Sequence, residues 1–178
     1  YVPKDEDRIW TKPADPTFYG GFNNDFTWKG FTLSVFFQFQ RGAVSLWNDK
    51  LVLASYEGDT NLLSDMYYKH WSQPGDMTWV PKPSYQSAYP GNPRQISEYS
   101  TLCYEKTDYI KLKNVSLSYD FPTKWLKGLY ISILQLYVSG YNLWTTTTYP
   151  GHDPEFTGGD LGTYPQSRSY TVGLKVDF

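Results

Sequence analysis

Residues 109–121 read YIKLKNVSLSYDF and decide the fold, because apolar and polar residues alternate along most of this stretch. A period of two is typical of a β-strand whose two faces meet different surroundings. Ile110 and Leu112 share one face, whereas Val115 and every second residue after it have the opposite parity. A continuous apolar face therefore needs one extra residue, and we predict a β-bulge at Lys113-Asn114.

Four further segments alternate in the same way and are predicted strands: residues 18–28, 31–40, 134–141 and 170–178. Their connections alternate in length, with a tight turn at Lys29-Gly30, a long segment at 42–108, a short turn at 122–128 and a long loop at 145–166. In the long segment, residues 46–56 and 61–70 have the spacing of short helices, and the Pro-rich part beyond them is predicted to be irregular.

The composition excludes several classes of protein. The 178 residues contain 16 Lys+Arg against 18 Asp+Glu and no basic cluster, which argues against nucleic-acid binding. Cys103 is the single cysteine, so an intrachain disulfide framework is excluded, and we interpret it as an inert loop residue. No catalytic motif or phosphate-binding glycine loop occurs, so we predict neither enzymatic activity nor a cofactor. Aromatic residues make up 19%, which favours β structure.

Alternation of this kind fits either a soluble sheet or a transmembrane β-barrel, and three features favour the barrel. Several predicted strands have about 10 residues, the length of a tilted membrane-crossing strand. Short and long connections alternate, as between the two sides of an outer-membrane barrel. Aromatic residues gather at the short-turn ends of the strands, where Trp and Tyr prefer the membrane interface: Trp28, Phe31, Tyr119, Phe121, Trp125, Tyr130 and Phe178.

The predicted fold class is therefore all-β: five strands of an antiparallel transmembrane β-barrel. Strand parity assigns one set of side chains to lipid: Phe22, Phe26, Leu33, Val35, Phe37, Leu134, Leu136, Val138, Val172, Leu174 and Val176. Five strands cannot close a barrel, so we expect the chain to be part of a longer one. Residues 1–17 are predicted to be an entering loop, residues 18–178 the barrel portion, and residues 42–108 an extracellular loop within it.

Several stretches resemble one family. Residues 109–119 (YIKLKNVSLSY) resemble the strand YLRLKNVTLGY of SusC/RagA-type TonB-dependent outer-membrane transporters. Residues 136–145 (LYVSGYNLWT) resemble the family's VYVSGQNLFT strand, and the DPE at 153–155 is similar to the loop that follows it. Residues 164–174 (YPQSRSYTVGL) resemble its closing YPQPRTYTFGL strand. The hairpin formed by YGGFNN at 19–24 and FTLSVFFQ at 31–38 also fits, whereas residues 72–107 have no counterpart.

The resemblance implies the C-terminal portion of a 22-stranded barrel that carries an N-terminal plug. It implies import of oligosaccharides or oligopeptides across the outer membrane of Bacteroidota, energised by the TonB complex. It also implies a SusD-like surface lipoprotein as a lid, and a role for the terminal aromatic residue, Phe178, in barrel assembly. Two rival functions remain open at this point: a soluble, secreted β-sandwich module that binds carbohydrate, and a structural outer-membrane barrel without transport.

The candidate substrate- or lid-binding residues lie in the two long connections: Trp71, Trp79, Tyr85, Tyr89, Tyr149, His152, Asp153 and Glu155. Aromatic faces bind sugar rings by apolar contact, but the same side chains are also suited to packing the loop's own core or meeting the lid. His152, Asp153 and Glu155 are potential metal ligands, although a hydrogen-bonded turn is the favoured interpretation, and no metal site is predicted.

Overall fold

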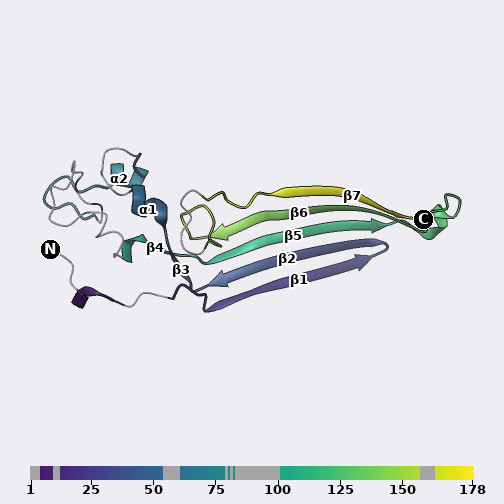
Figure 1. The fold of residues 1–178 in the computed structure, drawn as a ribbon, viewed down its shortest axis with the longest axis horizontal. Coiled ribbons are helices and arrows are strands. Elements are labelled where there is room, and N and C mark those ends of the chain that lie inside the picture. The colour runs from purple at the N-terminus through teal and green to yellow at the C-terminus, as the bar shows by residue number, and fades with distance from the viewer. Residues whose placement is uncertain are drawn as a thin grey trace.

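The computed structural model describes residues 5–9, 13–53, 61–78, 80, 82, 101–156 and 163–178. Its main feature is one sheet of five long antiparallel strands in the order β1-β2-β5-β6-β7 (Figure 1). The strands are β1 (Phe18–Trp28), β2 (Phe31–Arg41), β5 (Tyr109–Asp120), β6 (Ile133–Thr147) and β7 (Ser169–Asp177). Across the described residues, no helix has both the length and the apolar character needed to cross a membrane. The predicted antiparallel all-β class is confirmed, and these five strands form an open sheet with β1 and β7 at its edges.

The predicted bulge is confirmed. Along the β2–β5 pair, Phe36 lies opposite Asn114 while the next residue, Phe37, lies opposite Leu112. Lys113 is therefore the extra residue, and the apolar side chains before and after it return to the same face of the sheet.

Strand β6 is longer than the sequence predicts, because its alternation is interrupted inside the strand. Asn142 adopts a φ of 53°, and the pairing with β5 is irregular around it. The prediction ended this strand at residue 141 and began a loop at 145, whereas β6 continues to Thr147. Residues 142–147, which the prediction left out of the strand, extend the sheet toward the long connections.

The pairing register sorts the side chains into two faces, because directly opposed residues point to the same side. Phe22 lies opposite Phe37, Leu33 opposite Leu117, and Val138 opposite Val172. All eleven side chains predicted to share the apolar face do so. Large members of this face stay uncovered, including Phe22 at 59% and Val172 at 72% exposure.

The opposite face is polar from one edge of the sheet to the other. At one height, every strand contributes one short polar side chain, and we call this set the polar row: Asp25, Ser34, Ser116, Ser139 and Thr171, each opposite the next. The Ser34 hydroxyl donates to the Asp25 carboxylate within it. The polar row is therefore a band of short side chains that crosses the sheet between the two ends of the strands.

The short connections and the C-terminus meet at one end of the sheet (Figure 1). Lys29 and Gly30 have φ values of 47° and 87°, the paired positive values of a type I′ hairpin turn. The second connection contains a single helical turn, α4 (Thr123–Leu126), which the sequence reading did not predict. Aromatic rings pack here as predicted, with centroids of Phe31 and Tyr119 4.5 Å apart and those of Tyr119 and Phe121 5.0 Å apart. Phe178 follows β7 at this end.

The other end of the sheet carries the long segment between β2 and β5 (Figure 1). It contains β3 (Val44–Leu46), α1 (Asn48–Leu53), α2 (Ser64–Tyr68), η2 (Thr101–Cys103) and β4 (Tyr104–Lys106), while η1 (Asp5–Asp7) lies in the N-terminal stretch. Both helices fall inside the predicted ranges: α1 begins two residues later than predicted, and α2 is shorter than predicted at both ends. Strands β3 and β4, too short to show alternation, pair with each other and close the base of the segment.

Buried contacts hold that base together. Lys50 Nζ lies 3.1 Å from Glu105 Oε1, and the backbone N–H of Trp47 donates to the Cys103 carbonyl at 2.8 Å. Burial raises the pKa of the Cys103 thiol, and its side chain is 1% exposed, which agrees with the interpretation of an inert residue.

Candidate ligand-facing site

The most elaborate polar arrangement lies where the β6–β7 connection folds back over the polar face of the sheet. Two lysines of β5, Lys111 and Lys113, point toward this connection and meet Asp153 and Glu155. We call these four residues the charge cluster. Lys111 Nζ is 2.6 Å from Asp153 Oδ1 and 2.6 Å from Glu155 Oε2, and Lys113 Nζ is 2.6 Å from the same Glu155 oxygen.

The charge cluster is electrically balanced, and two of its four members are buried while Lys113 and Glu155 are partly exposed. Lys111 is 4% exposed and Asp153 is 5% exposed. Two ammonium groups face two carboxylates, so their formal charges cancel. An unpaired charge in such surroundings is costly, whereas this geometry gives each charge a partner within hydrogen-bond distance.

The backbone of the connection is shaped to present both carboxylates together. Asp153 Oδ1 accepts the Glu155 N–H at 3.0 Å, and the Asp153 carbonyl accepts the Phe156 N–H at 3.2 Å. This is a turn in which an Asp side chain caps the backbone two residues on. Pro154 between the two carboxylates is buried, and Tyr149 at the start of the connection is 4% exposed.

Two opposing effects act on the pKa of Glu155. Partial burial raises it, but hydrogen bonds and charges from Lys111 and Lys113 lower it by more, so the net pKa lies below the ordinary glutamate value. Glu155 is therefore a carboxylate at neutral pH, as the ion pairs require.

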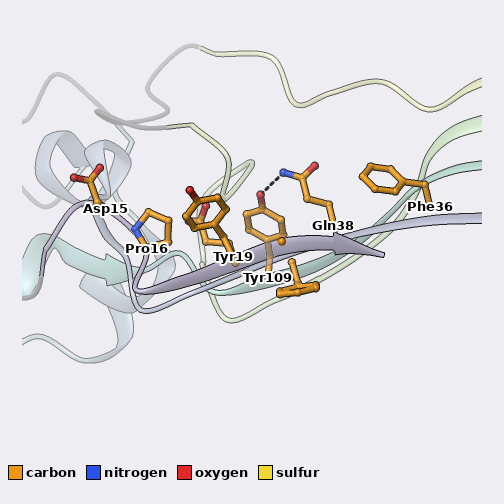
Figure 2. Close-up of a pocket in the computed structure, with 10 residues that line it drawn as sticks. Asp15, Pro16, Tyr19, Phe36, Gln38 and Tyr109 are labelled. Carbon is orange, nitrogen blue, oxygen red and sulfur yellow. Dashed lines mark hydrogen bonds between the residues drawn. The ribbon is translucent and has the colours of Figure 1, made fainter. Parts of the chain in front are cut away.

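A pocket of about 610 Å³ opens on the polar face beside the charge cluster, over β1, β2 and the start of β5 (Figure 2). Tyr19, Phe36, Gln38 and Tyr109 extend from the strands to the same side of the sheet, with Asp15 at one end. The Phe36 ring lies directly over Gly21, where a Cβ would come within 2.7 Å of the ring. Of the described residues that line the pocket, Asp15 alone carries a formal charge.

Hydrogen bonds connect the pocket to the charge cluster. Gln38 Nε2 donates to the Tyr109 hydroxyl at 2.9 Å, and this hydroxyl donates to Glu155 Oε1 at 3.4 Å. Figure 2 shows the amide nitrogen of Gln38 turned to Tyr109 and its oxygen turned away. The orientation of a pocket-lining amide is therefore tied to Glu155, and through it to Lys111.

The candidate residues predicted from the sequence divide into three groups. Tyr149, His152, Asp153 and Glu155 lie together in the β6–β7 connection, and His152 Nδ1 is 3.6 Å from Asp49 Oδ2 of α1. Trp71 follows α2 and is half-buried, and its backbone N–H donates to the Val80 carbonyl at 2.9 Å. Trp79, Tyr85 and Tyr89 lie outside the described residues.

In the described part of the chain, no group of three or more His, Cys, Asp and Glu side chains is arranged to hold a metal ion. The carboxylates of Asp153 and Glu155 are engaged by lysines, and His152 instead approaches Asp49. The favoured interpretation of a hydrogen-bonded turn at 153–155 is confirmed.

Sequence reasoning missed the pocket residues Gln38 and Tyr109 and the partners of the two lysines. Lys111 and Lys113 lie on the polar face of the sheet, and both of them bind Glu155. One signal was available: two lysines on the polar parity of a predicted membrane strand need counter-charges, and the DPE of the next long loop offers two.

No family model matches the sequence. Two curated proteins of Formosa agariphila are similar to it. TonB-dependent receptor P3 is 36% identical over 97% of this chain, and TonB-dependent receptor P39 is 29% identical over 90%. The chain spans only 17% and 16% of the lengths of these relatives.

Solved structures of the RagAB peptide importer have the same fold. In its closed-closed state, the match covers all of this chain and 19% of the solved chain, at 28% identity and a TM-score of 0.82. In the open-open state, the match again covers all of this chain and 20% of the solved one, at 26% identity and a TM-score of 0.74. Sequence and fold thus agree with the resemblance carried by the strand motifs: over nearly all of its length the chain is similar to part of a SusC/RagA-type TonB-dependent receptor, and its five long strands match part of such a barrel protein.

Proposed function

We propose that the protein carrying this chain imports an oligomeric nutrient, an oligosaccharide or an oligopeptide, across the bacterial outer membrane by TonB-dependent transport. The single observation that supports this most is the contrast between the two faces of the β1-β2-β5-β6-β7 sheet. One face is apolar and exposed, including Phe26 at 59% and Leu174 at 61%, and the other carries the pocket and the charge cluster. Lipid outside and a wet lumen inside account for both faces at once.

The β-sandwich alternative needs a second sheet packed on the apolar face. The described residues form one long-stranded layer, and the only other sheet among them is the pair of three-residue strands β3 and β4. In water, an apolar face of this extent without a covering layer favours aggregation. The observations therefore favour the membrane-spanning interpretation.

The proposed orientation places residues 42–108 and the β6–β7 connection outside the cell, and the short turns and Phe178 in the periplasm. The length difference between the two sets of connections supports it. In this orientation the pocket faces the extracellular half of the lumen, and residues 18–178 are the barrel portion. A SusD-like surface lipoprotein would cover that side, and the TonB complex would act through other parts of the full-length protein.

Deletion of the full-length gene in its own bacterium tests the transport function. The deletion strain and its parent are grown on single oligosaccharide preparations and on peptide digests, each as the sole carbon source. We expect the mutant to lose growth on one nutrient class, and inactivation of TonB to cause the same loss. Equal growth of both strains on every nutrient would instead favour a structural barrel.

The partner is tested separately by affinity purification of the full-length protein from detergent-solubilised outer membranes. We expect a surface lipoprotein to co-purify in a stoichiometric amount. Recovery of the barrel alone, from membranes that contain the lipoprotein, would contradict the partnership without touching the transport result.

A further inference from the structure

The charge cluster is built by two parts of the chain that are far apart in sequence. Lys111 and Lys113 belong to a rigid strand in the middle of the sheet, hydrogen-bonded on both sides to β2 and β6. Asp153 and Glu155 belong to the β6–β7 connection, whose described residues, 148–156 and 163–168, contain no helix or strand. A connection of this kind has a fixed position only if specific contacts provide one, and the ion pairs are such contacts.

The connection itself buries the charges that hold it. Lys111 faces the polar side of the sheet, the side proposed to be wet, yet its side chain is only 4% exposed. The carboxylates of Asp153 and Glu155 form ion pairs with its ammonium group. Burial and pairing therefore arise together, and each charge depends on the others staying in place.

Hydrogen bonds link the position of Glu155 in the charge cluster to the pocket. Glu155 uses one oxygen for the two lysines and the other for the Tyr109 hydroxyl. Tyr109 in turn receives the Gln38 amide, whose oxygen is turned away from this contact (Figure 2). If Glu155 moved away, Tyr109 would lose its acceptor and the Gln38 amide would lose its fixed orientation.

We infer that Lys111 is a positioning residue, which clamps residues 149–156 onto the polar face as a fixed part of the pocket's surroundings. In this arrangement, the carboxylates of Asp153 and Glu155 act within the protein and are not free to bind a ligand. The role of the pocket in uptake rests on the proposed function, but the clamp itself does not.

Hydrogen exchange of the full-length protein in detergent, read by mass spectrometry on peptides covering residues 148–156, tests the clamp. Lys111→Met leaves two carboxylates beside one lysine, and we expect exchange in this segment to accelerate by about tenfold or more. Lys111→Arg keeps the charge and should stay within about twofold of the wild type. Lys175→Met is the matched control, because Lys175 lies on the same face beside Asp177 and is 57% exposed.

A double variant separates charge from packing. Adding Asp153→Asn to Lys111→Met restores balance, because Lys113 and Glu155 then remain as one pair, and Asn can still accept the Glu155 N–H. We expect this second change to recover part of the lost protection. If it accelerates exchange further, or if Lys111→Met alone exchanges as slowly as the wild type, the electrostatic clamp is wrong. Heat-dependent migration in SDS gels confirms that each variant still forms a barrel, and none of these measurements depends on transport.

Discussion

Gly173 and Tyr137 lie directly opposite each other in the β6–β7 pair, and the phenol ring of Tyr137 fills the space that a side chain at position 173 would need. A glycine in a strand interior usually weakens the strand, but here its missing Cβ makes room for an aromatic ring. A diagonal contact of the same kind occurs on β1, where the ring of Phe36, which lies opposite Asn23, covers Gly21.

We therefore predict that Gly173→Ala destabilises the full-length protein by about 1 kcal/mol, the low end of overpacking costs, because the ring end can swing away. Guanidinium unfolding in detergent, followed by tryptophan fluorescence, measures the change. Gly128→Ala is the control, because no atom lies within 4 Å of its added Cβ. In a Tyr137→Ala background the cost of Gly173→Ala should disappear, and an unchanged cost there would contradict the packing explanation.

The two faces of β7 make a second prediction possible with substitutions one residue apart. Val172 lies on the apolar face and Thr171 in the polar row. Val172→Lys would place a charge against lipid, at a cost of roughly 2–4 kcal/mol near the midplane. We expect Val172→Lys to lower the amount of folded protein in the outer membrane well below that of Thr171→Lys. Equal amounts, measured by quantitative blotting of membrane fractions, would mean that the lipid-facing assignment is wrong.

The bulge residue provides a third prediction. Deleting Lys113 removes the extra residue and leaves simple alternation through β5, in which Ile110 and Leu112 stay on the apolar face and Tyr109 and Lys111 stay on the polar face. Both faces of the sheet are kept, so we expect the deletion to insert into the outer membrane about as well as Lys113→Ala, which keeps the residue count. Much less folded protein for the deletion than for Lys113→Ala, measured by quantitative blotting of membrane fractions, would mean that Lys113 is not the extra residue of the strand.

The lowered pKa of Glu155 gives a pH dependence with a definite sign. A carboxylate with a folded-state pKa below its unfolded value, about 4.3, stabilises the folded position above that value. This contribution is lost as the pH falls through the folded-state pKa. We predict that wild type and Glu155→Gln differ in exchange of residues 148–156 at pH 7, and that the difference shrinks below about pH 4. Comparing the two proteins at each pH removes the intrinsic pH dependence of exchange, and a difference that persists at low pH would contradict the assignment.

The sequence predicts the strands well wherever one apolar face must be kept. Strand β1 has the predicted bounds, and the bulge at Lys113 follows from parity alone. The predicted end of β6 was wrong because Asn142 leaves the extended conformation inside the strand. The alternation of apolar and polar residues therefore stops before the strand pairing does. Strands β3 and β4 have three residues each and show no period.

The site was less predictable, since it depends on where a loop folds back. Asp153 was recognised as part of a turn, but its partner Lys111 lies 42 residues away in sequence. Nothing local in the alternation pattern specifies that meeting, which is decided by the path of the β6–β7 connection over the sheet. The same holds for Gln38 and Tyr109, which meet across the β2–β5 pair.

The polar row also determines how far side chains project from the polar face of the sheet. Ser34, Ser116 and Ser139 project only short hydroxyl groups, so the layer of side chains on this face is thin at their height. Toward the long connections, Tyr109 and Lys111 extend much further inward, and the loop they hold adds its own thickness. This face is therefore thin along the polar row and thick at the level of Tyr109 and Lys111, and in the proposed barrel this part of the wall would narrow the lumen toward the long connections.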